Sequence, residues 1–442
     1  MFKSRVSFRE STREIFANNN FRFVVLTGLV HMAIYSAIEP FTTLYLRDIG
    51  ISYLRIGYLD AICSLFIIPS VLVGSYLSDL LSHRRSRFAA TNCCCWGVMC
   101  IIYSMVGHSR PWSAMVVFVI AGLSYTFHAP SRAYMLDQSP QDNHHTAMAF
   151  FSLYRLPMLL VFCALLWLFK VYGFITGMRL GLFLGGSVIV TMGLVRAFIL
   201  TDLPKDVHIT REKPCLTGLI KDNGYTLRYL IVVAPAFVII TLLDSFSDCC
   251  WSFLIYFILN EQAGLSASEI LQGRLTIDLL SIPVILYLAF RINKSNGRKA
   301  FFLLYLVIPI AVGLLILSRS YPNIPFVPDF IPFANVAFLA YCLKYIQDFL
   351  WLHILLTPVA MLLVPKEHST KAIGISWLLA NLSRLIGSPL AGWVYQSYTN
   401  GSTILLGGIL VLNFLILITI LTLDCDLGYN SPPNGESRPR SK

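Results

Sequence analysis

The sequence predicts an all-α membrane protein with about twelve transmembrane helices in two pseudo-symmetric six-helix halves. Hydrophobic residues make up 56% of the 442 residues and charged residues only 13%, whereas a soluble domain carries roughly a quarter charged residues. Apolar runs of about twenty residues recur along the chain, and each can cross about 30 Å of hydrocarbon. The longest polar break, residues 201–228, separates six runs from six.

Charged residues and Pro, Gly or Asn bound each apolar run. Helices are expected because backbone groups in lipid must pair internally, and the ten-residue alternation of barrel strands does not appear. The predicted spans lie near residues 23–46, 54–78, 88–107, 112–134, 146–169, 179–200, 229–259, 267–290, 300–318, 331–363, 371–397 and 402–423.

These spans predict five parts of the chain. They are a cytoplasmic N-terminal segment (1–22), an N-terminal six-helix bundle (23–200), a central cytoplasmic loop (201–228), a C-terminal six-helix bundle (229–423) and a cytoplasmic, disordered tail (424–442). The first 22 residues are polar and basic and carry no short apolar core with a cleavage site, so we expect no cleaved signal peptide.

Lysine and arginine predict the orientation. With both termini inside, 22 of the 34 lie in inner segments, 6 in outer loops and 6 within helices. This bias follows the positive-inside rule and predicts an integral protein of the plasma membrane with cytoplasmic termini. The net charge of +11 then reflects topology and anionic inner-leaflet lipid, and we expect no nucleic-acid partner.

The polar loops indicate an internal duplication. Gly50-Ile51-Ser52 after the first span matches Gly264-Leu265-Ser266 after the seventh. The two segments are 214 residues apart (264 − 50), and we call this separation the repeat offset. The segment SPQDNHHTAMAF (139–150) matches VPKEHSTKAIGI (364–375) at a larger separation, and the Pro-rich outer loop YPNIPFVPDFIP of the second half accounts for the extra residues. Because composition does not force matches in polar loops, they favour a true repeat.

A short basic segment, GSYLSDLLSHRRSR (74–87), follows the second span. It is similar to the loop signature of the major facilitator superfamily, Gly-x-x-x-Asp-Arg/Lys-x-Gly-x-Arg/Lys-Arg/Lys. The matching residues are Asp79, Arg84 and Arg85, and the departures are Ser75, Leu80 and Ser82. Gly122, the run from Pro130 to Asp137 and the run from Arg384 to Trp393 also resemble segments of this superfamily.

Ionisable residues inside spans are costly unless paired or wet, so each is a functional candidate. Asp244, Asp248 and Trp251 lie at i, i+4 and i+7 on one helix face, and Lys344, Asp348 and Trp351 repeat that spacing. The resemblance implies a cavity lined by spans one, four, seven and ten. It places there Glu39, His128, Asp244, Asp248, Lys344 and Asp348.

Two features among these residues have more than one interpretation. Lys344 and Asp348 can simply form an i,i+4 ion pair, whereas the two acids on span seven need a separate cation: Lys344, Arg274, a substrate amine or a proton. Glu39 precedes Pro40, which frees a backbone carbonyl beside the carboxylate. Glu39 is therefore the first candidate for proton coupling.

A second set of residues is expected to act in gating. Asp79 is predicted to brace the closed inner gate, and Arg84 and Arg85 to contact acids on adjacent helix ends, although a purely topogenic loop also explains the arginines. Asp60 and Arg274, which are separated by the repeat offset, could latch the outer gate; the alternative is local pairing of Arg274 with Asp278. Arg132, Asp137 and Arg384 complete the expected set.

The predicted function is secondary active transport of a small organic solute by alternating access, coupled to protons or another ion, in a monomer. The alternatives are a drug/proton antiporter, which would carry a Gly-x-x-x-Gly-Pro-like motif that span five lacks, and a membrane solute sensor that does not transport. An enzyme or ATP-driven pump is not expected, because His-x-x-x-His, Gly-x-Ser-x-Gly and Walker motifs are missing. Eleven cysteines without a C-x-x-C pair predict no metal or other cofactor.

Overall fold

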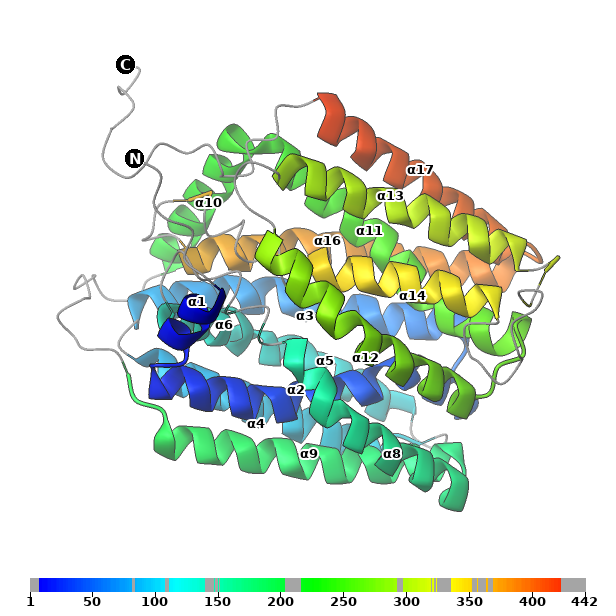
Figure 1. Cartoon of the computed structure of the whole chain (residues 1–442), viewed down its shortest axis with the longest axis horizontal. Helices are drawn as coiled ribbons and strands as arrows, with labels where there is room; N and C mark the ends of the chain where they lie inside the picture. Colours follow the sequence, from blue (N-terminus) through cyan, green and yellow to red (C-terminus); the bar gives the residue numbers. More distant parts are fainter. Residues whose placement is uncertain are drawn as a thin grey trace.

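The computed structural model is a bundle of long helices (Figure 1). It describes residues 8–422 apart from 82–83, 108–110, 140–146, 148–149, 151, 203–215, 292–296, 319, 322, 324–334, 352–355, 357–362 and 365–368. Among the described residues, six helices are long and apolar enough to cross a membrane. The expected all-α class is confirmed.

The first half of the chain forms the helices that contain the first six predicted spans. They are α1 (Phe8–Ile15), α2 (Asn19–Asp48), α3 (Tyr53–Leu80), α4 (Arg85–Ser104), α5 (Pro111–Ser124) continued by η2 (Tyr125–Phe127) and α6 (His128–Asp137), η4 (Ser152–Tyr154) with α8 (Arg155–Tyr172), and α9 (Phe174–Ile199).

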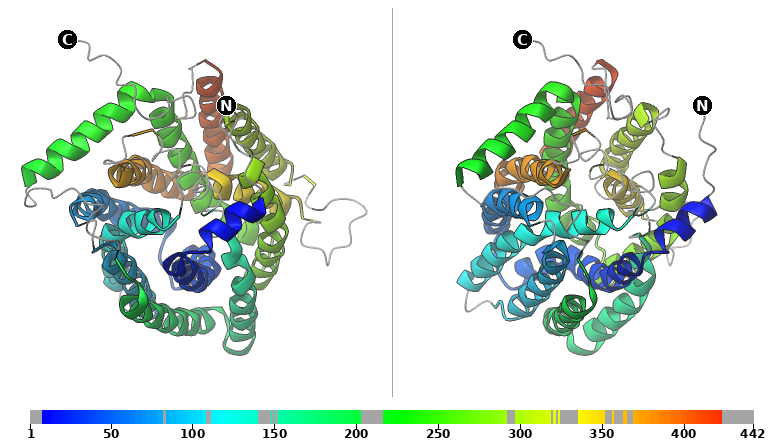
Figure 2. Two further views of the ribbon diagram at one scale, coloured as in Figure 1. Left: turned by 60° about the vertical axis from the view of Figure 1, so that its left-hand side comes forward. Right: turned by 90° about the vertical axis from the view of Figure 1, so that its left-hand side faces the viewer.

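The second half contains the other six spans and one additional helix, α10. Its elements are α10 (Leu216–Val233), α11 (Pro235–Phe257) with η6 (Ile258–Gln262), α12 (Ala267–Arg291), α13 (Gly297–Leu317), α14 (Val336–Phe349), α16 (Ser369–Ser397) and α17 (Gly401–Thr422). Figure 2 shows α10 at the periphery of the bundle.

Several predicted boundaries differ from the structure, and two of the differences have a clear physical reason. The seventh span begins at Pro235 instead of 229, because proline favours the first position of a helix, where no backbone donor is needed. The residues before it, predicted as loop up to 228, already form α10. The tenth span was predicted from 331, but α14 begins at Val336, since the side chain of Asn335 caps it by accepting a hydrogen bond from the Phe338 amide at 3.2 Å.

The duplicated turns have the same backbone form in both halves. Gly50 and Gly264 have φ angles of 93° and 70°, which side chains rarely adopt. Ser52 and Ser266 then begin the next helices, and each accepts a backbone hydrogen bond at 3.0 Å from Ile56 and Ile270, respectively. The repeat offset thus relates two equivalent structures at this turn.

Two seams join the halves of the chain: α3 packs along α16, and α8 packs against α12. In the first seam the backbones approach closely, since a Cβ on Gly57 would lie 2.5 Å from the carbonyl oxygen of Ser388. Figure 1 shows α3 and α16 side by side through the middle of the bundle. A bulky residue at Gly57 would therefore force the two helices apart.

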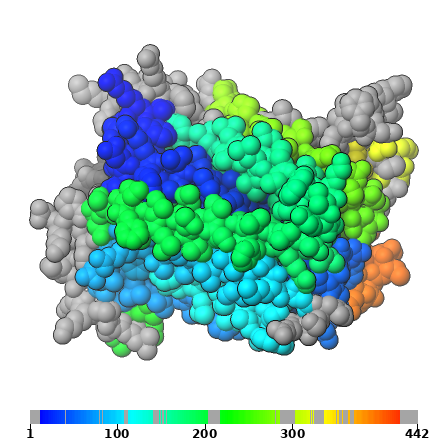
Figure 3. Space-filling model, turned by 90° about the horizontal axis from the view of Figure 1, so that it is seen from below, coloured from blue at the N-terminus to red at the C-terminus, as the bar shows by residue number. Residues whose placement is uncertain are grey.

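The outer helices expose apolar side chains. Figure 3 shows α9 on one face of the molecule between α2 and α4. Phe183, Leu184, Leu194 and Phe198 of α9 are exposed. A surface of this kind suits contact with lipid tails.

The turn before α12 provides a test of the repeat. Ser266 and Glu269 form a reciprocal cap, in which the Ser266 hydroxyl accepts from the Glu269 amide at 3.3 Å and the Glu269 carboxylate accepts from the Ser266 amide at 2.7 Å. We expect Ser266→Ala to lower the free energy of unfolding by about 1 kcal/mol. Thermal unfolding in detergent should show this as a lower Tm.

The matched control for this substitution is Ser52→Ala. Ser52 occupies the equivalent position, and its side chain makes no capping hydrogen bond. Equal losses from the two substitutions would mean that the cap is not what stabilises the second turn.

Candidate functional site

A cavity of about 470 Å³ lies at the centre of the bundle. Residues of α2, α3, α4, α6, α11, α12, α14 and α16 line it, so both halves of the chain contribute. Its volume is within the range of about 300–1,000 Å³ that is usual for small-molecule sites.

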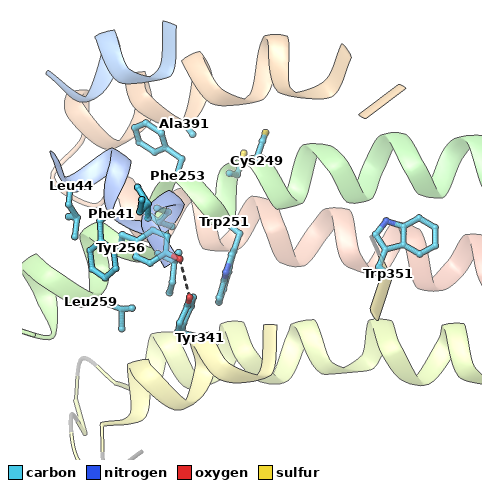
Figure 4. Packing of buried hydrophobic residues seen from close by; sticks show 14 of the residues in the cluster. Phe41, Leu44, Cys249, Trp251, Phe253, Tyr256, Leu259, Tyr341, Trp351 and Ala391 are labelled. Carbon is cyan, nitrogen blue, oxygen red and sulfur yellow. Dashed lines mark hydrogen bonds between the residues drawn. The ribbon is translucent and has the colours of Figure 1, made fainter. Parts of the chain in front are cut away.

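The structure divides the predicted binding residues into two groups. Those that line the cavity are Glu39, His128, Asp248, Trp251 and Asp348. Asp244, Lys344 and Trp351 are not among the lining residues and are buried behind the wall, with Lys344 fully buried. Figure 4 shows Trp251 and Trp351 well apart, so the two tryptophans do not form a common wall.

Lys344 is at the centre of a charge cluster that joins three helices. Its amino group contacts Asp348 one turn along α14, and it lies 3.4 Å from Asp248 of α11. Asp248 in turn lies 3.5 Å from the guanidinium of Arg384 on α16. The local pair and the cross-helix pair expected from the sequence therefore coexist.

Arg274 forms a second cluster beside the cavity. It pairs with Asp278 at 3.1 Å, donates to the Tyr256 hydroxyl at 3.1 Å and to the Tyr341 hydroxyl, and lies 3.7 Å over the ring of Tyr345. Figure 4 shows Tyr256 and Tyr341 facing each other, with their hydroxyls 3.0 Å apart. Arg274 was expected to pair either with Asp60 or with Asp278, and the structure has the pair with Asp278.

Asp60, the repeat partner of Arg274, has a different contact. Its carboxylate accepts a hydrogen bond from the Ser388 hydroxyl across the seam between α3 and α16. Asp60, Arg274, Arg132 and Arg384, which were expected at gates, all line the central cavity. The repeat offset alone did not distinguish a gate from a cavity wall.

Aromatic rings form a continuous wall on one side of the cavity. The ring of Trp96 lies 4.7 Å from Tyr35 and 5.5 Å from Tyr125, and Trp377 lies 5.8 Å from Tyr125. All four line the cavity. This wall was not predicted from the sequence, because the only aromatic residues singled out there as candidate site residues were Trp251 and Trp351, which lie at helical spacing from charged residues.

The remaining candidates on this side are His128 and Arg132. His128 lies 4.9 Å from the Trp377 ring and accepts a hydrogen bond from Arg132 at 3.1 Å. The Arg132 guanidinium is 5.7 Å from the Trp377 ring centre. These contacts hold Arg132 beside the aromatic wall.

Glu261 links the two halves at the end of the bundle where α2 ends. It lies 3.1 Å from Arg47 and accepts hydrogen bonds from Tyr53 at 2.5 Å and Tyr395 at 3.0 Å. The sequence analysis did not single out Arg47 or Glu261. The available signal was the repeat offset, which separates these two positions as it separates the two duplicated turns.

At the opposite end, Arg85 connects the two halves. It pairs with Asp137 and donates to the Thr370 hydroxyl, at the start of α16, at 3.2 Å. Arg84 is exposed. The side chain of Asp79 lies outside the described part of the structure, so its expected brace stays a prediction.

The burial of Lys344 leads to a stability prediction. Lys344→Met leaves Asp248 and Asp348 without their shared cation, and the loss of one partner from a buried pair costs about 3–5 kcal/mol. We expect a much lower Tm in detergent. Adding Asp348→Asn should restore part of the loss, because it removes one uncompensated carboxylate.

Asp348→Asn alone is the control for that pair of variants, since Lys344 keeps Asp248. A double variant no more stable than Lys344→Met would contradict the predicted coupling.

Comparisons with known proteins agree with this architecture. Residues 2–161 match the family model described as Major Facilitator Superfamily. No curated protein sequence matches the chain at a significant level.

Solved transporter structures match over nearly the whole chain. One of proton-dependent oligopeptide transporters has 12% identity and a TM-score of 0.65, covering 91% of this chain and 96% of its own. The human organic anion transporter MFSD10 has 15% identity and a TM-score of 0.58, covering 92% and 99%. The proton:xylose symporter XylE has 15% identity and a TM-score of 0.58, covering 92% and 95%.

At these identities the solved structures show the fold alone, whereas the family model matches the sequence itself over the first part of the chain. Together they confirm the resemblance seen in the sequence, and the chain is a helical membrane protein with the fold of the major facilitator superfamily.

Proposed function

We propose that the protein is a secondary transporter that moves a small organic solute across the membrane by alternating access. The observation that carries this proposal is the central cavity, which both halves line and which contacts between the halves flank at either end. A cavity flanked in this way can open on one side when the contacts at that end break.

The clusters in the cavity favour proton coupling. Lys344, Arg384 and the carboxylates of Asp248 and Asp348 are within reach of one another, so a proton on one carboxylate changes the pairing of the rest. Two of the solved relatives are described as proton-coupled, the xylose symporter and the oligopeptide transporters. We infer that Glu39, Asp244 and Asp248 include the coupling carboxylate.

The proposed organisation follows the basic residues and the repeat. Two six-helix bundles, 23–200 and 229–423, rock about the cavity, and residues 1–22, 201–228 and 424–442 are cytoplasmic. The protein would act as a monomer in the plasma membrane. The bias of Lys and Arg towards the inner segments supports this orientation.

Cysteine labelling tests the orientation. In a variant without other reactive cysteines, Ser441→Cys should resist an impermeant thiol reagent in intact cells, whereas Asn400→Cys, in the turn before α17, should react. Permeabilised cells should label both and so serve as the control. Labelling of Ser441→Cys alone in intact cells would reverse the orientation.

Glu261 tests alternating access. Glu261→Gln weakens its contacts with Arg47, Tyr53 and Tyr395, which are partly exposed and contribute about 1 kcal/mol together. We expect a cysteine at Thr43, which lines the cavity, to react about five-fold faster with an impermeant reagent.

The control for Glu261→Gln is Glu269→Gln. Glu269 lies near the same end of the bundle, and glutamine preserves its capping role. Equal reaction rates in the wild type and Glu261→Gln would show that this network does not hold the cavity closed.

Glu39→Gln tests coupling in proteoliposomes. The amide should abolish accumulation driven by a pH gradient and leave exchange of solute for solute at saturating solute concentration, because exchange needs only reorientation of the loaded carrier. Glu14→Gln, which changes an exposed carboxylate of α1, is the control. If Glu39→Gln, Asp244→Asn and Asp248→Asn all retain pH-driven accumulation, coupling uses another residue or ion. If the wild-type protein transports no solute at all, a membrane sensor is favoured instead.

A further inference from the structure

Glu39 differs from the other charged residues of the cavity in its surroundings. Its side chain is exposed to the cavity, and the described residues provide its carboxylate with neither a hydrogen bond nor an ion pair. An ionised carboxylate at membrane depth is costly without a partner. The site therefore lacks a positive charge at this position.

Two of the arginines that line the cavity are paired with carboxylates. Arg274 and Arg384 line the same cavity as Glu39, but Arg274 pairs with Asp278 and is almost fully buried. Arg384 pairs with Asp248 and also interacts with Asp60. An anionic ligand approaching Arg384 would therefore meet two carboxylates.

Aromatic rings lie next to Glu39. Tyr35 precedes it by one helical turn on α2, and both residues line the cavity. The Trp96 ring lies 4.7 Å from Tyr35 in an edge-to-face arrangement. Ring faces beside a carboxylate attract ammonium groups through cation–π interactions, and they also bind apolar bodies.

We propose that the solute is an organic cation, an ammonium group attached to an apolar or aromatic body. The ammonium contacts the Glu39 carboxylate and the rings of Tyr35 and Trp96, while the body packs along the wall towards Tyr125 and Trp377. This inference rests on the proposed function and deepens it by naming the class of solute.

Three probes with the same body test the charge preference. Phenethylamine carries only the ammonium, phenylalanine adds a carboxylate, and 3-phenylpropionate carries only the carboxylate; naphthyl analogues of all three provide a larger body. Calorimetry on the purified full chain should show the amine binding at least about ten-fold more tightly than the propionate, with the amino acid between them.

Other orders of affinity overturn the proposal. Tighter binding of the amino acid than of the amine would indicate a zwitterion, and tightest binding of the propionate would indicate an anion. Failure of both amines to bind at millimolar concentration would also show that the proposal is wrong.

Substitutions test which residues produce the preference for an ammonium group. Glu39→Gln should lose about ten-fold in affinity for the amine, and Glu39→Asp should recover part of it. Tyr35→Leu should weaken binding several-fold, whereas Tyr35→Phe, which keeps the ring, should not. Arg179→Gln is the control for a changed charge, because Arg179 bonds Tyr45 and Val106 away from the cavity. Unchanged amine affinity in folded Glu39→Gln would remove Glu39 from the site.

The same assays separate this inference from the proposed function. Accumulation of an anionic or zwitterionic solute would support transport and overturn the organic cation. Binding of the amines without solute movement in proteoliposomes would support the cation site and overturn transport.

Discussion

The cost of placing charge inside a membrane determines much of this structure. Each buried ion must find a partner, because neither water nor lipid compensates it there. Lys344 meets this requirement through Asp348 on its own helix and Asp248 on α11, and Arg384 shares Asp248 from α16. Pairing of this kind holds helices in register across the cavity. It also makes the pairs sensitive to any added proton or charged solute.

The internal repeat determines which charged residues occupy equivalent positions in the two halves of the chain. Positions separated by the repeat offset are equivalent at the duplicated turns, and two such positions can touch only where the two halves of the chain meet. Arg47 and Glu261 meet this condition and form an ion pair at 3.1 Å. Asp60 and Arg274 share the offset, but Asp60 bonds Ser388 and Arg274 bonds Asp278. The same duplication thus yields a direct contact between the two equivalent positions at one level and different partners for each of them at the next.

Local features were predictable from the sequence, and contacts between distant spans were less so. Apolar length predicted the helices, and Gly50 and Gly264 marked the repeated turns, where both have positive φ angles that favour glycine. The pair of Lys344 and Asp348 follows from helical spacing. By contrast, nothing local in the sequence says that Arg384 reaches Asp248, or that Tyr35, Trp96 and Trp377 share one wall, because those contacts depend on how helices pack. The late start of α14 depended on the Asn335 cap, which follows an apolar, proline-rich stretch of the sequence.

Glu39 is an exception to this pairing of charges, and the exception suits a role in binding. A protein that only needed stability would pair this carboxylate or replace it, as it pairs the carboxylates of Asp248, Asp278 and Asp348. Because the Glu39 carboxylate lines the cavity and has no ion pair among the described residues, a proton or an ammonium group can neutralise it there. Because either one neutralises the same oxygen atoms, occupancy by one weakens the need for the other. A carboxylate that lines the cavity and has no ion pair among the described residues is therefore well placed to bind and release a charge from outside the protein.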